Sequence, residues 1–101
     1  MTEENQKSEK AKPRTIHIVS DDTGKEYEFT WPQNHHISRY AREASGGNAL
    51  KASTNLVMEL AIKPGRTELQ EMFKDKPGLP IALGNEIGKA TGITEEFSRK
   101  N

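Results

Sequence analysis

The chain has 101 residues, no cysteine and a formal net charge of zero, with 15 Lys and Arg against 15 Asp and Glu. Balanced charge provides no long-range field toward phosphate backbones or anionic lipid, which argues against generic binding of nucleic acid or of a membrane surface. The lack of cysteine excludes disulfides and thiolate metal sites, and no stretch approaches the roughly 18 apolar residues of a membrane span. We therefore expect a soluble cytoplasmic protein.

The N-terminal segment is polar. Residues 1–13, MTEENQKSEKAKP, have no large apolar side chain after Met1. Such a segment buries too little apolar surface to fold, so it is predicted to be a disordered arm. Residues 14–92 are then expected to form a single domain. A domain of this size buries only about 60–65% of the surface that its unfolded chain exposes, so association with a partner would add to its stability.

Alternating apolar and polar residues predict a β-hairpin at the start of this domain. Thr15–Val19 has Ile16 and Ile18 on one face, and a turn-forming cluster follows at residues 20–24. Lys25–Trp31 alternates again, with its three aromatic side chains on one face. A two-stranded hairpin is only marginally stable in water, so its apolar face needs cover from the helices that follow.

Helical periodicity dominates the rest of the domain. Amphipathic patterns predict helices over residues 34–44 and 49–62. Thr67 and Gln70 have the spacing of a capping box and predict a short helix after them. Pro80 suits the first turn of a last helix, whose expected core face holds Leu79, Leu83, Ile87 and Ala90. The fold class is α+β, an N-terminal β-hairpin followed by three to four helices, and residues 93–101 are expected to form a frayed C-terminal tail.

Three glycines lie at four-residue spacing in the last helix, at Gly84, Gly88 and Gly92. Each glycine inside a helix costs about 1 kcal/mol relative to alanine, so the stripe requires a compensation such as the close approach of another segment. An internal helix crossing and an intermolecular contact both satisfy this requirement. The polar neighbours of the stripe exclude the membrane dimerisation motif, which requires an apolar helix of about 20 residues.

The sequence predicts no catalytic, cofactor-binding or metal site. His35 and His36 are adjacent, so a helix separates their directions by about 100°, unlike the paired histidines of metal sites. The acidic residues of the hairpin have the pattern of a solvated face, and no serine lies in the G-x-S-x-G context of a nucleophile. We expect no enzyme activity.

The predicted helices carry more apolar residues than the one buried face of a simple surface helix requires. This excess suggests protein binding. Methionine-bearing apolar surfaces can repack around different partners. Filling the core of a small domain is the alternative role for these side chains, notably for Trp31. The residues that we single out for partner binding are Trp31, Leu56, Met58, Ile62, Met72, Phe73, Gly84 and Gly88.

The order of these features resembles that of the small tail assembly chaperones of tailed bacteriophages and prophages. The resemblance extends from about Arg14 to Gly92 and rests on the sequential arrangement of its segments rather than on any one motif. These segments are the polar arm, the hairpin end Tyr27–Pro32, the helix start Ser38–Tyr40, the stretch Leu56–Leu60 and the stretch Pro77–Ala90.

The resemblance implies a non-enzymatic protein in the cytoplasm of a bacterial host. It would hold the tape measure protein soluble while tail tube subunits polymerise around it, and apolar residues near Leu56, Met58, Ile62, Met72 and Phe73 would cover apolar helix of this client. Many members also have a frameshifted longer form. A weak homo-oligomer is left open, as are two alternatives: a structural tail, connector or tail completion protein that forms rings, and a small regulatory binding module.

Overall fold

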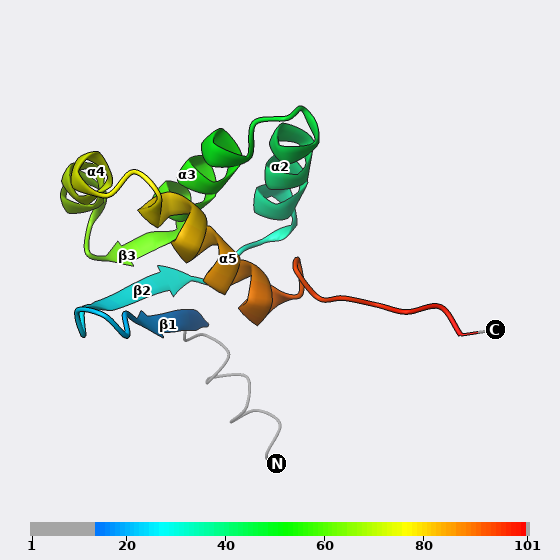
Figure 1. The fold of residues 1–101 in the computed structure, drawn as a ribbon, viewed down its shortest axis with the longest axis horizontal. Coiled ribbons are helices and arrows are strands. Elements are labelled where there is room, and N and C mark those ends of the chain that lie inside the picture. Colours follow the sequence, from blue (N-terminus) through cyan, green and yellow to red (C-terminus); the bar gives the residue numbers. More distant parts are fainter. Residues whose placement is uncertain (1–13, 101) are drawn as a thin grey trace, which may run out of the picture.

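A computed structural model describes residues 14–100 and has a three-stranded antiparallel sheet covered on one face by helices (Figure 1). The chain is a single small α+β domain, which confirms the predicted fold class. The elements in chain order are β1 Thr15–Val19, β2 Glu26–Thr30, α2 Asn34–Ser45, α3 Ala49–Leu60, β3 Ala61–Lys63, α4 Arg66–Asp75 and α5 Leu79–Thr91.

The predicted hairpin is confirmed as β1 and β2. The strands pair in register, with Ile16 opposite Phe29 and Ile18 opposite Tyr27. Side chains alternate between the faces of a strand, so these four lie on one face, where Ile16, Tyr27 and Phe29 are buried. β-Branched and aromatic residues suit such a half-buried, pleated surface.

The third strand was not predicted. The expected helix over residues 49–62 ends at Leu60, and Ala61–Lys63 pairs with the far side of β2 as β3. The pairing shifts register between Glu28 and Phe29. Pairing with β2 satisfies backbone groups that a longer helix would have satisfied within itself, and a strand of three residues is too short for its alternation to compete with the helical period.

Helix α5 crosses the inner face of the sheet, and α3 packs against both α5 and α2 (Figure 1). One hydrophobic core joins the sheet to α3, α4 and α5. Helix α2 is the outermost layer and contributes no buried residue. The core consists of Ile16, Tyr27, Phe29, Leu56, Val57, Leu60, Leu69, Leu83 and Ile87.

Two details of the predicted helices are wrong. Helix α4 begins at Arg66 after the N-cap Gly65, with no side-chain capping bond, so Thr67 lies within the helix rather than at its N-cap. Ala90 of α5 is exposed, although Leu83 and Ile87 are buried as expected. The buried face of α5 therefore ends before Ala90, although the apolar pattern of the sequence continues to that residue.

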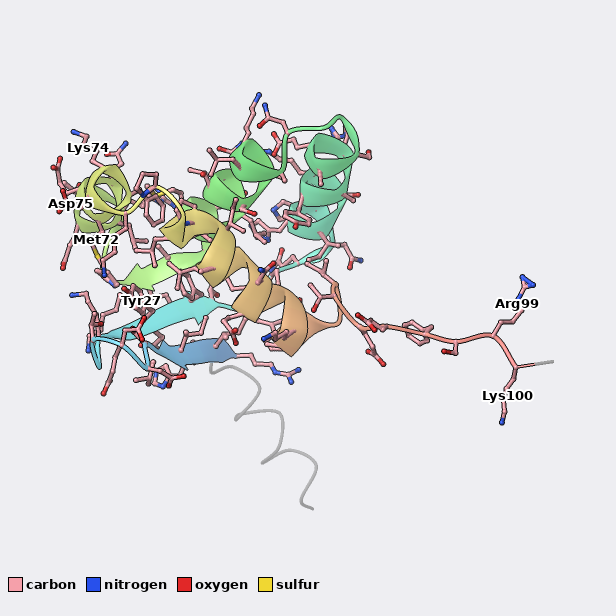
Figure 2. All side chains as sticks on the ribbon, viewed as in Figure 1. Tyr27, Met72, Lys74, Asp75, Arg99 and Lys100 are labelled. Carbon is pink, nitrogen blue, oxygen red and sulfur yellow. The ribbon has the colours of Figure 1, made fainter. Side chains whose placement is uncertain are left out.

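The two ends of the chain were predicted to be a disordered arm and a frayed tail. The predicted disordered arm, residues 1–13, lies outside the described residues. After a turn at residues 92–94, the described chain has no helix or strand and extends away from the domain, with Arg99 and Lys100 far from the helices (Figure 2). The side chain of Phe97 is 83% exposed. That the tail frays stays a prediction.

Candidate protein-binding surfaces

The two glycines predicted for partner binding are buried inside the chain. A Cβ atom added at Gly84 would lie 3.1 Å from Ser53 Oγ of α3, and one added at Gly88 would lie 2.7 Å from Thr94 Cγ2 of the turn after α5. The close approach that the stripe requires is thus supplied at both positions by this chain. Neither glycine is available for direct contact with a partner in this structure.

Leu56 and Trp31 are also part of the packed interior. Leu56 is 2% exposed and belongs to the core. Trp31 is half-buried against the core, and the guanidinium carbon of Arg14 lies 3.7 Å from the centroid of its ring. A cation over an indole face contributes about 0.5–1 kcal/mol at exposed sites. This contact holds Arg14 beside the start of β1.

The other four predicted residues lie on three consecutive elements: Met58 in the last turn of α3, Ile62 in β3, and Met72 and Phe73 in α4. We call Met58, Ile62, Met72 and Phe73 the terminal patch. Ile62 is 47% exposed, and the other three are half-buried side chains that pack against the core. In Figure 2, Met72 lies on the side of α4 toward β3, whereas Lys74 and Asp75 project from its outer side.

Polar contacts fix the elements that carry the terminal patch. The Nε–H of Arg66 donates to the carbonyl oxygen of Met58 at 2.9 Å, which ties the start of α4 to the last turn of α3. Lys25 Nζ lies 3.1 Å from Glu68 Oε2 and joins the hairpin turn to the same helix. Exposed ion pairs contribute only about 0–1 kcal/mol each, so their main effect here is orientation.

A second concave surface lies between β1 and α5, and sequence reasoning missed it. It is an open groove of about 770 Å³ whose apolar lining includes Ile18, Tyr27, Leu79 and Leu83. The elements that form it are more than 50 residues apart in the chain. The one signal in the sequence was Val19, an apolar residue at the end of a predicted strand, which is exposed in the structure.

Three carboxylates line the same groove, and they make it net acidic. Asp21 and Asp22 come from the hairpin turn and Glu86 from α5, against one ammonium group, that of Lys76. Glu86 is also paired with Lys89 at 3.1 Å. The groove therefore combines apolar walls with a negative rim, a chemistry that suits a partner segment with both apolar and basic side chains.

The adjacent histidines have a local structural role. The backbone N–H of Gln33 donates to His36 Nδ1 at 2.9 Å at the start of α2, and the two histidine rings lie 4.0 Å apart. Burial lowers the pKa of His36, and the neighbouring His35 and Arg39 lower it further against the opposing effect of Glu59. A neutral ring preserves the acceptor that caps the helix.

Within residues 14–100, no cluster of three or more His, Cys, Asp or Glu side chains is placed to hold a metal ion. Over the same part of the chain, none of the helices has the length and apolar character needed to cross a bilayer.

Comparison with known proteins places the chain in a family and supports its fold. A family model described as "Domain of unknown function (DUF6848)" matches residues 7–100, and the chain belongs to this family. The structure is similar to that of the uncharacterised protein rbstp2171 from Bacillus stearothermophilus, with a TM-score of 0.75 and 21% identity over 95% of this chain and 99% of that one. At this identity the likeness establishes the fold alone. No curated protein matches the chain.

Proposed function

We propose that this protein is a non-enzymatic binding protein that acts as a tail assembly chaperone of a bacteriophage or prophage in the cytoplasm of a bacterial host. Its client is the tape measure protein, which it keeps soluble during tail assembly, and tail tube subunits are further partners. The observation that carries the proposal is the terminal patch. It comprises an exposed isoleucine and three half-buried apolar side chains on three consecutive elements of the chain.

The chemistry of the terminal patch suits an apolar helix of a client. Two of its four side chains are methionines, which adapt to irregular apolar surfaces because they are unbranched and polarisable. An amphipathic helix that docks in this way contacts its receptor through side chains at positions i, i+3, i+4 and i+7. The charged residues Lys63, Arg66 and Glu71, which are close to the patch in the sequence, are exposed.

Co-expression tests this proposal. The chain is produced together with a long coiled-coil tape measure protein, the proposed client, and the soluble fraction is examined by affinity capture and size measurement. We expect the coiled-coil protein to become soluble and to copurify with the chain. A coiled-coil protein whose solubility is the same with and without the chain would refute the proposal.

A structural tail or connector protein is the second candidate, and one observation favours it. Within residues 14–100, β1 and β3 are the two edge strands of the sheet, because β2 is its middle strand. Pairing of β1 of one copy with β3 of the next would repeat without a two-fold axis, and such head-to-tail contacts generate rings or filaments. Stable rings of the purified chain would support this candidate, whereas a monomer or dimer would exclude it.

A further inference from the structure

Along the outer edge of β1, backbone groups at alternate residues have no partner among residues 14–100. The N–H of Ser20 donates to the Lys25 carbonyl at 2.9 Å, and the N–H of Trp31 donates to the Arg14 carbonyl at 3.0 Å. Hydrogen-bonded and non-hydrogen-bonded pairs alternate in an antiparallel ladder. The residues of β1 whose backbone bonds to β2 are therefore Ile16 and Ile18. The N–H and C=O groups of Thr15, His17 and Val19 point away from the sheet.

Within residues 14–100, no segment pairs with this edge, and its own residues carry little of the usual protection against pairing. Natural sheets guard their edges with proline, lysine or a covering segment, and the five residues of β1 include neither proline nor lysine. Val19 is 57% exposed, and the side chain of His17 is 70% exposed. An apolar, β-branched residue on an open strand edge is a good site for the addition of another strand.

We propose that β1 pairs antiparallel with β1 of a second copy of this chain, about a two-fold axis at His17. This is the two-fold register that pairs every residue of both strands. It places His17 opposite His17 of the second copy and Thr15 opposite Val19. Each of these outward-facing residues then exchanges two backbone hydrogen bonds with its opposite. Cross-strand pairs of β-branched residues such as Thr and Val also stabilise a sheet.

Charge complementarity supports a second copy of the chain as the partner of β1. In the same register, Arg14 of the second copy lies opposite Ser20, next to the acidic Asp21 and Asp22 of the hairpin turn. The contact of Arg14 with Trp31 keeps its positive charge at the start of β1. Each basic strand start thus meets the acidic groove at the end of the other β1, and the two-fold axis makes this contact occur twice.

The interface would be small. Two five-residue strands are far fewer than the roughly 20–30 residues a side of a standard protein interface. We therefore expect a weak dimer whose fraction rises with protein concentration. The terminal patch lies elsewhere on the domain, so pairing through β1 leaves it free. Dimerisation and client binding can therefore be tested separately.

Proline at position 17 tests the pairing. The N–H of His17 points outward, so His17→Pro removes a donor needed by the second copy without breaking a bond to β2, and proline is tolerated at such edge positions. His17→Ala keeps the donor and is the matched control. By sedimentation equilibrium, we expect wild type and His17→Ala to form concentration-dependent dimers and His17→Pro to remain monomeric. A monomeric wild type, rings, or a dimer that survives in folded His17→Pro would overturn the proposal.

A cysteine variant tests the register and does not depend on how well the proline variant folds. Residues in a hydrogen-bonded antiparallel pair have Cα atoms about 5.5 Å apart, within the range of a disulfide. The chain has no cysteine of its own, so any disulfide reports the introduced residue. On mild oxidation, His17→Cys should give a disulfide-linked dimer much faster than Lys51→Cys, an exposed control on α3. Equal rates for the two variants would contradict the register.

Discussion

Glycine at position 84 sets the distance between α3 and α5, and replacing it with alanine tests this crossing. Alanine would gain about 1 kcal/mol of helix propensity over glycine. Its Cβ would, however, lie 3.1 Å from Ser53 Oγ and 3.2 Å from Ser53 Cβ. Ser53 is buried within α3, so it cannot turn away without moving the helix. Overpacking of this kind costs about 1–3 kcal/mol, and we expect Gly84→Ala to be destabilised by about 1 kcal/mol net.

Gly88→Ala is the matched control on the same stripe. Its new Cβ would meet the methyl group of Thr94 at 2.7 Å, but Thr94 is exposed in the turn after the helix and can move. We expect Gly88→Ala to be neutral or stabilised, by at most about 1 kcal/mol. Urea and thermal unfolding, followed by circular dichroism, measure both changes. A shift of 1 kcal/mol corresponds to about 4–8 °C in Tm for a domain of this size. If the free energy of unfolding of Gly84→Ala rose by the full 1 kcal/mol or so of helix propensity, the crossing of α3 and α5 would have room for a methyl group. That result would refute the reasoning.

Two further predictions concern His36, whose ring caps the start of α2, and the hydrophobic core. Because the pKa of folded His36 lies below its ordinary value of about 6.5, the unfolded chain binds the proton more readily and stability falls as pH drops below that value. The free energy of unfolding of His36→Asn, measured in urea at a series of pH values, should fall less on acidification than that of wild type; equal slopes would contradict the assignment. Leu60→Ala removes a fully buried side chain and should cost about 2–5 kcal/mol. Leu50→Ala, at a residue 49% exposed, should change stability by no more than about 0.5 kcal/mol in the same unfolding assay, and similar losses in the two variants would show that Leu60 is not a core residue.

Local patterns predicted most of the secondary structure because their causes are local. Alternation in Thr15–Val19 and Glu26–Thr30 is a property of a strand with one buried face, and it predicted the hairpin with its inward side. The end of α3 at Leu60 is different, because a strand partner that lies some 30 residues earlier in the chain decides it. Helical spacing continues through Ile62 in the sequence, and only the fold shows that Ala61–Lys63 completes a sheet.

The candidate surfaces also include parts that local sequence patterns indicate and parts that depend on segments distant in the chain. Met58 and Ile62 could be singled out because they lie beyond one face of the helix predicted over residues 49–62, and Met72 because methionine-bearing surfaces can repack around different partners. Gly84 could be recognised as a close approach, but the pattern alone did not show that Ser53 is its neighbour. The acidic groove was unpredictable, since it exists only when the hairpin turn and the start of α5 are brought together in the fold.

The most direct test of the proposed function compares two exposed apolar residues at different places on the domain. Ile62 in the terminal patch is 47% exposed and Leu50 at the start of α3 is 49% exposed, so Ile62→Asp and Leu50→Asp introduce the same charge at similar exposure. Both variants are first shown by unfolding to be folded, and each is then co-expressed with the long coiled-coil tape measure protein that is the proposed client. The proposal predicts that Leu50→Asp retains the soluble complex and that folded Ile62→Asp loses it. Retention of the complex by folded Ile62→Asp, at the level of wild type, would contradict the role of the terminal patch.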